Sequence, residues 1–210
     1  MLDIIRIENS PVKSNCFVVF DKSFSNGCLV VDPGSEDDHR ITTAIQNNQL
    51  TIDYIFLTHE HFDHIWSVNA ILGKFPKARL VCSKICGEKI IDRKKNCSLF
   101  YDQIGFELPK PTLITDELTA GIRWNNHTIS FMDTPGHSEG SICIAVDKNL
   151  FTGDTLIPNE KTVTKLPGGS VKDIKQTMEK LQLLKGKNLI IHPGHGDSFL
   201  LDDYDLSKML

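Results

Sequence analysis

The stretch that decides the fold runs from Tyr54 to His64 and reads Tyr-Ile-Phe-Leu-Thr-His-Glu-His-Phe-Asp-His. Its first four residues are apolar and favour a buried strand. Beyond them, three histidines and one aspartate fall within six residues: His59, His61, Asp63 and His64. Side chains two apart on an extended chain point the same way, so His59, His61 and Asp63 can converge while His64 covers another direction. Imidazole and carboxylate donors without a thiolate predict a zinc, iron or manganese site.

Three further segments place one ligand-type residue among small residues just beyond a predicted strand. They are Thr-Pro-Gly-His137, Thr-Gly-Asp154-Thr and Pro-Gly-His195-Gly. Glycine beside each candidate lets the backbone turn tightly and approach a site closely. Because strand ends gather at an edge of a sheet, the four segments together predict one metal centre.

Composition places the chain among ordinary globular proteins and predicts a single domain over residues 1–210. The chain has 40% apolar and 24% charged residues, which excludes disorder, collagen and coiled coil. Its net charge of −4, without a Lys/Arg stripe, argues against a dedicated nucleic-acid binder and favours a small-molecule substrate.

Localisation follows from apolar runs and cysteine use. No segment reaches 18 uninterrupted apolar residues, and the N-terminus reads as a first strand rather than a signal peptide, so we expect no membrane association. The six cysteines lack the paired spacing of a disulfide framework, which predicts buried thiols in a reducing cytoplasm.

Strand-like and helix-like runs alternate, which predicts an α/β (α+β) chain. A hairpin is expected from residues 17–20 and 28–32 through Asn26-Gly27, and a helix capped by Ser35 through Gln46. A second helix should be ended by Gly73, and the clearest one begins at the capping box of Ser170. The same patterns predict a further helix over residues 83–91. They also predict strands over residues 79–82, 129–133, 142–146, 150–152 and 189–191. Residues 94–111 fit neither period and form either a packed surface loop or part of a substrate pocket.

The chain resembles the metallo-β-lactamase superfamily, and most closely its hydroxyacylglutathione hydrolase (glyoxalase II) branch. The resemblance covers Val-Asp32-Pro-Gly, the His-x-His-x-Asp-His stretch, Thr-Pro-Gly-His137, Gly-Asp154-Thr, Pro-Gly-Gly169 and Pro-Gly-His195. It implies a four-layer αβ/βα sandwich with two metal ions, zinc most of all, with iron or manganese as alternatives.

The resemblance also implies a role for each candidate. His59, His61 and His137 would hold the first ion, Asp63, His64 and His195 the second, and Asp154 would bridge them. Asp32 would support the ligands from behind or anchor its loop. Asp63 and Asp154 would be the catalytic carboxylates that move a proton to the leaving group. Lys161, Lys165 and Tyr101 are the candidate substrate contacts.

Four departures from relatives narrow the range of possible activities. In the resembling two-zinc β-lactamases the residue at Asp154 does not bridge, and the flavodiiron branch has glutamate in place of His61. Full-length glyoxalase II carries a helical glutathione-binding domain, which we expect to be missing because fifteen residues follow His195. Lys165 precedes Leu-Pro-Gly-Gly where relatives often have an acid.

The predicted function is therefore metal-dependent hydrolysis of a thioester or related ester by a hydroxide that a dinuclear centre supplies. One alternative is a mono-iron enzyme that uses persulfide or oxygen, for which His59, His61 and His137 would suffice. A phosphodiesterase or nuclease would need a basic arm. A non-catalytic metal-binding protein would fit an incomplete ligand set, whereas all seven positions are filled.

Overall fold

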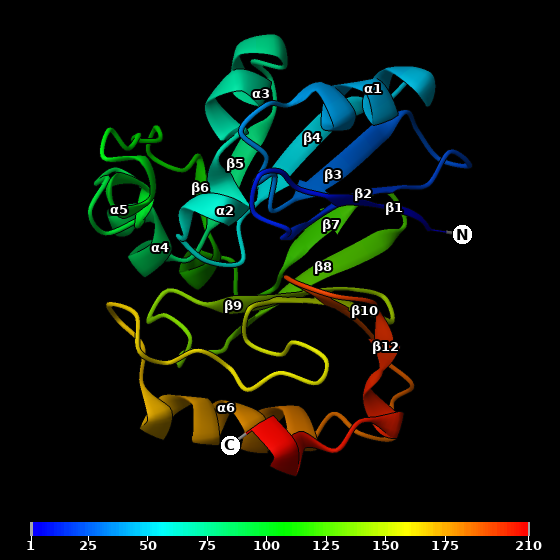
Figure 1. The fold of residues 1–210 in the computed structure, drawn as a ribbon. Helices are drawn as coiled ribbons and strands as arrows, with labels where there is room; N and C mark the ends of the chain where they lie inside the picture. The colour runs from blue at the N-terminus through cyan, green and yellow to red at the C-terminus, as the bar shows by residue number, and fades with distance from the viewer. Residues whose placement is uncertain (1, 210) are drawn as a thin grey trace. The chain divides into compact units, whose positions relative to one another are not determined.

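A computed structural model describes residues 2–209, and it divides the chain into two compact units, one up to Glu117 and one from Leu118 onward. Each unit is built on one six-stranded sheet with helices (Figure 1). The single domain over residues 1–210 stays a prediction.

The first unit is a mixed sheet in the order β1-β2-β3-β4-β5-β6. Its strands are β1 (Asp3–Glu8), β2 (Asn15–Phe20), β3 (Gly27–Val31), β4 (Thr51–Phe56), β5 (Arg79–Cys82) and β6 (Leu113–Ile114). Its helices are α1 (His39–Asn47), α2 (Phe62–Ile65), α3 (Val68–Lys74), α4 (Lys84–Lys89), α5 (Ser98–Asp102) and the 3-10 turn η1 (Thr115–Glu117). The β1–β3 pairs are antiparallel and the β3–β6 pairs are parallel. Asp32 and Thr58, which follow β3 and β4, therefore leave the sheet at the same edge.

Helices α1 and α3 lie over one face of this sheet (Figure 1). Each buries an apolar stripe, Ile41 and Ile45 from α1 and Val68 and Ile71 from α3, in one core with strand residues such as Val30. Strands β2 and β3 are buried along their whole length, which is why they read as continuous apolar runs rather than as alternation.

The second unit is a sheet in the order β12-β11-β10-β9-β8-β7. Its strands are β7 (Ile122–Trp124), β8 (His127–Asp133), β9 (Ile142–Val146), β10 (Asn149–Gly153), β11 (Ile190–Pro193) and β12 (Phe199–Leu200). Its helical elements are α6 (Val171–Gln182), η2 (Leu201–Asp203) and η3 (Leu206–Met209). Helix α6 packs Ile174, Met178 and Leu181 into a core with sheet residues such as Ile191 (Figure 1).

The strand predictions are confirmed, two of them at both ends, but several local signals were misread. Ser35 does not cap α1: its hydroxyl donates to Asn9 and accepts from the Ser10 backbone, and α1 begins only at His39. Gly73 lies inside α3 instead of ending it. The hairpin of β2 and β3 is confirmed, although Gly27 belongs to the strand and a longer loop makes the turn.

The buried thiols are confirmed. All six cysteines are free, and every one but the half-buried Cys97 is buried. Burial raises the pKa of Cys28 and of Cys143 to about 12, so both stay neutral. Among residues 2–209, no helix has the length and apolar character that crossing a membrane requires.

Ser170 is the N-cap of α6, with its hydroxyl accepting the backbone N–H of Asp173 at 3.2 Å. We expect Ser170→Ala to lower the free energy of unfolding by about 1 kcal/mol, because the first turn loses that acceptor. Urea denaturation measures the change. The matched control is Ser130→Ala, at an exposed position on β8, which should change stability by less than ~0.5 kcal/mol. Equal stability of the two variants would contradict the capping role.

Candidate metal centre

In the first unit, the site is organised by the carboxylate of Asp32, which follows β3 and is only 2% exposed. One oxygen accepts the backbone N–H of Thr58 at 2.8 Å. The other accepts the Thr58 hydroxyl at 2.6 Å and lies 3.1 Å from Nδ1 of His64. Asp32 adopts a left-handed φ of +52°, a conformation that aspartate tolerates better than most residues. Asp32 thus makes three contacts to the segment after β4, and its support of the metal ligands stays a prediction.

These contacts determine the tautomers of two histidines. Thr58 has a single hydroxyl proton, which it donates to Asp32, so its oxygen must accept from Nδ1 of His59 at 3.0 Å. Nδ1 of His64 donates to the Asp32 carboxylate in the same way. Each ring therefore carries its lone pair on Nε2, the arrangement that a carboxylate or hydroxyl partner creates in metal-binding histidines.

The remaining first-unit candidates lie beside these two. The ring of His59 is 4.8 Å from that of His61 and 4.3 Å from that of His64, and all three are buried. Oδ2 of Asp63 is 3.6 Å from Nε2 of His64. Two donors on one tetrahedral ion with bonds of 2.0–2.2 Å stand about 3.4 Å apart, so this spacing fits a shared ion.

Gly34 explains why the Asp-Pro-Gly segment is close to the ligand loop. A Cβ at Gly34 would stand 1.5 Å from the backbone oxygen of Asp63, so only glycine fits there. The hydroxyl of Ser14 donates to the same oxygen at 2.5 Å. The backbone of Asp63 is therefore held by residues from two other loops.

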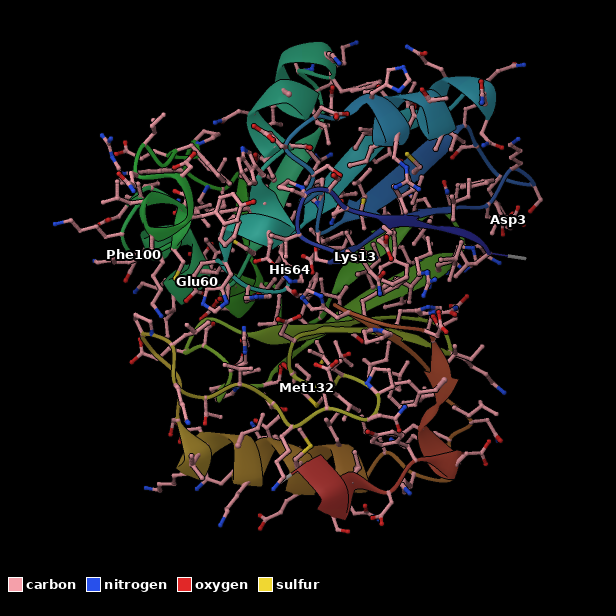
Figure 2. The ribbon with its side chains drawn as sticks, viewed as in Figure 1. Asp3, Lys13, Glu60, His64, Phe100 and Met132 are labelled. Atoms are coloured by element: carbon pink, nitrogen blue, oxygen red, sulfur yellow. The ribbon has the colours of Figure 1, made fainter. Side chains whose placement is uncertain are left out.

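Sequence reasoning missed a buried ion pair behind the ligands. Glu60, between His59 and His61, is fully buried, and one of its oxygens is 2.9 Å from Nζ of Lys89 at the end of α4. Figure 2 labels Glu60 and His64 in this unit. A fully buried carboxylate needs such a partner. The only sequence signal was an acid in an otherwise ligand-type motif, which does not reveal where its charge lies.

In the second unit, three loops carry the candidates and leave the sheet at one edge. Strands β10 and β11 are parallel, and β8 runs in the same direction because β9 is antiparallel to both β8 and β10. The loops are also hydrogen bonded together. The hydroxyls of Thr134 and Thr155 are 3.2 Å apart, and the backbone N–H of Gly194 donates to Gly153 at 2.8 Å.

Asp154 lies between two histidines. Its Oδ2 is 3.6 Å from Nε2 of His137 and 3.5 Å from Nε2 of His195. Both spacings again match two donors on one ion. A single carboxylate beside two imidazoles is what a bridging ligand requires.

His137 is oriented by backbone. Its Nδ1 donates to the carbonyl of Val163 at 2.9 Å, which leaves the Nε2 lone pair on the side of Asp154. Gly136, with φ of +140°, lets this loop pass close to α6, because a Cβ there would stand 2.6 Å from Ile174.

The other three histidines of the chain lie outside the candidate set. Nδ1 and Nε2 of His192 contact Ser198 and Asn149 at 2.9 and 3.0 Å, and burial lowers the pKa of His192 to about 4. His127 begins β8 and its Nδ1 is 2.7 Å from Asp147, while His39 is exposed at the start of α1.

The predicted substrate contacts fall in two places. Lys161 and Lys165 line a cleft of about 430 Å³ in the second unit, together with Val163, whose carbonyl holds His137. Tyr101 belongs to α5 in the first unit, where its ring is 4.7 Å from that of Phe62. The two lysines therefore share a cleft, and Tyr101 packs on the residue between His61 and Asp63.

The donor set fits divalent metal ions. It consists of carboxylate oxygens and imidazole nitrogens, with the tautomer defined for His59, His64 and His137, and zinc and iron accept both kinds of donor. Within each unit, the measured pairs have the spacing of ligands on a common ion.

Comparison with known proteins agrees with this chemistry. A family model described as the metallo-β-lactamase superfamily matches residues 9–198. The hydroxyacylglutathione hydrolase 1 of Vibrio vulnificus is 31% identical over 185 residues, which are 87% of this chain and 62% of that protein. A probable polyketide biosynthesis zinc-dependent hydrolase of Bacillus subtilis is 26% identical over 180 residues, 86% and 72% of the two chains. The crystal structure of the BLEG-1 B3 metallo-β-lactamase superposes with a TM-score of 0.84 at 28% identity, over 96% of this chain and 94% of that one.

These matches confirm the predicted fold class, the α/β metallo-β-lactamase sandwich with its two sheets. They also confirm the predicted resemblance to hydroxyacylglutathione hydrolases.

The variant Asp32→Ala tests whether the Asp32 carboxylate supports the candidate metal ligands. We expect zinc affinity to fall by about 10–100-fold, because His64 loses the partner of its Nδ1 and the Thr58 hydroxyl, which contacts His59, loses its acceptor. The free energy of unfolding should fall by at least about 1–3 kcal/mol, since the Thr58 N–H is left buried and unsatisfied. Chelator competition and urea denaturation measure the two effects. The control, Asp3→Ala on the exposed start of β1, should change neither. If Asp32→Ala binds zinc as tightly as the wild type does, Asp32 does not support the metal centre.

Proposed function

Because the chain belongs to the metallo-β-lactamase superfamily of metal-dependent hydrolases, we propose that it is a dinuclear enzyme that cleaves thioesters or related esters of small molecules. The observation that carries the proposal is the position of Asp154, with one carboxylate oxygen within 3.6 Å of two imidazole nitrogens.

The ligand assignment follows the family pattern. By that pattern His59, His61 and His137 would hold the first ion, Asp63, His64 and His195 would hold the second, and Asp154 would be shared by both. Support comes from the Nε2 lone pairs of His59, His64 and His137, which their Nδ1 partners impose. Zinc is the proposed metal, since nitrogen and oxygen donors suit it and the Bacillus relative is named a zinc-dependent hydrolase.

When bound, the two ions supply hydroxide at neutral pH and polarise the substrate carbonyl. The chain's own residues then have two tasks. Nδ1 partners hold the rings of His59, His64 and His137, which would keep the ligand geometry rigid. Asp63 and Asp154, each with a partly exposed side chain, would hold a proton and pass it to the leaving group.

A thioester suits this set of residues because a thiolate leaves with little help from an acid. The Vibrio relative is named a hydroxyacylglutathione hydrolase, and this chain spans 62% of its length. The cleft with Lys161 and Lys165 supplies positive charge for an anionic thiol carrier. The free buried cysteines support a reducing compartment, and we propose the cytoplasm.

Metal content distinguishes a bridging Asp154 from a ligand of one ion. We expect about two zinc ions per chain in the wild type, one in His195→Ala and fewer than one in Asp154→Ala. The kcat of Asp154→Ala should be at least ~100-fold lower than that of the wild type. Elemental analysis and thioesterase assays measure these quantities. His39→Ala, at an exposed position, is the control with two ions. A wild-type stoichiometry of one would favour the mono-iron alternative, and near-normal turnover by Asp154→Ala would exclude its bridging role.

The substrate class is tested with one panel of thioester, lactone, phosphodiester, persulfide and β-lactam substrates on the fully metallated protein. Thioesters should be turned over fastest. Lys165→Ala should raise KM for an anionic thioester about fivefold, equivalent to ~1 kcal/mol, and lower kcat less, because the charge acts on the carrier rather than on the carbonyl. Lys172→Ala, exposed on α6, is the matched control. Absent thioester cleavage, or faster turnover of another class, would overturn the proposal.

A further inference from the structure

The segment of residues 94–111 exposes large apolar side chains in the first unit. Phe100 is 69%, Tyr101 47% and Ile104 71% exposed. Figure 2 labels Phe100 at the α5 side of this unit. A gathering of exposed aromatic and aliphatic groups commonly marks a place where a ligand or a partner binds.

Of these side chains, Tyr101 belongs to a packed group of rings. Its centroid is 4.7 Å from Phe62 and 5.4 Å from Trp66, and the latter two rings are 5.7 Å apart in a T-shaped arrangement. We call Phe62, Trp66 and Tyr101 the aromatic cluster. Phe106 stacks on Trp66 at 5.7 Å and connects the cluster to the core of the unit.

Hydrogen bonds hold α5 against the unit. The fully buried Asn96 donates to the carbonyl of Phe106 at 2.8 Å and accepts the Ser98 N–H at 2.9 Å. The Ser98 hydroxyl accepts the N–H of Phe106 at 2.9 Å, and Asp102 accepts the N–H groups of Ile104 and Gly105. Tyr101 is therefore presented by a preorganised loop, which reduces the ordering cost of binding.

The aromatic cluster directly adjoins the metal-binding stretch. Phe62 lies between His61 and Asp63 in the chain and begins α2, and Trp66 is one helical turn later on the same face. Tyr101 covers both rings. The cluster is thus joined through the backbone of Phe62 to two proposed ligands, His61 and Asp63.

We infer that the aromatic cluster binds an apolar acyl group and makes the enzyme prefer thioesters with an arylacetyl or medium-length alkyl acyl chain over acetyl thioesters. The inference rests on the proposed function and adds the chemistry of the acyl part. Three ring faces and edges bury apolar surface favourably, whereas they offer a carboxylate or a phosphate little.

The test is a series of N-acetylcysteamine thioesters that differ only in the acyl group: acetyl, hexanoyl and phenylacetyl. In the metallated wild type, kcat/KM for phenylacetyl and hexanoyl should exceed that for acetyl by about tenfold or more, the usual value of a few apolar carbons in a pocket. Tyr101→Ala should reduce this ratio to near one, and Tyr101→Phe should restore it. Phe24→Ala, at an exposed phenylalanine outside residues 94–111, should keep the wild-type ratio.

Binding without turnover supplies a second measurement. Trp66 lies in the aromatic cluster, so in a Trp124→Phe background its fluorescence should respond to the S-(2-phenylethyl) thioether of N-acetylcysteamine and not to the S-ethyl thioether. Tyr101→Ala should weaken the binding about tenfold.

The outcomes separate the two proposals. Thioester cleavage with equal kcat/KM along the acyl series overturns the inference and leaves the proposed function in place. Absent cleavage of every thioester overturns the proposed function, while the fluorescence titration still decides whether the aromatic cluster binds apolar groups. An equal loss of the ratio in Phe24→Ala and Tyr101→Ala would show that the preference does not depend on the aromatic cluster and would also overturn the inference.

Discussion

The buried carboxylate of Asp32 is the interaction on which the first half of the site depends. It ties the end of β3 to Thr58 after β4 and to His64 in α2. A carboxylate at 2% exposure is tolerated only if it is hydrogen bonded, and its three contacts meet that requirement. The same contacts place the lone pairs of His59 and His64 on Nε2. The interaction that compensates for burying the charge is therefore also the one that prepares the histidines for metal.

The second unit prepares its ligands with backbone groups instead. The carbonyl of Val163 orients the ring of His137. Hydrogen bonds to neighbouring loops hold Gly153 and Thr155, the two chain neighbours of Asp154. These contacts keep the Asp154 carboxylate within 3.6 Å of Nε2 of both His137 and His195. A metal ion needs donors at this spacing, whereas a site without an ion gains little from them. Both units thus use the same principle, in which the groups behind the ligands are as well ordered as the ligands themselves.

The proposed recognition of the substrate divides along the two parts of a thioester. Positive charge from Lys161 and Lys165 would suit a thiol carrier, and the aromatic cluster would suit an apolar acyl group. Hydrolysis itself is assigned to the candidate metal ligands. The proposal therefore separates the residues that select the substrate from those that carry the chemistry.

The sequence by itself determined the family, the order of most strands and the residue type of each candidate ligand. These properties depend on local patterns, namely apolar runs, glycine-rich strand ends and the His-x-His-x-Asp-His stretch. It could not assign Ser35, which looks like a helix cap but bonds to Asn9, nor reveal that Glu60 pairs with Lys89. It left residues 94–111 open, whereas the structure packs Tyr101 on Phe62. Only the tertiary structure decided these contacts, because each joins residues 26 to 39 positions apart whose encounter depends on how strands and helices pack rather than on the residues beside them.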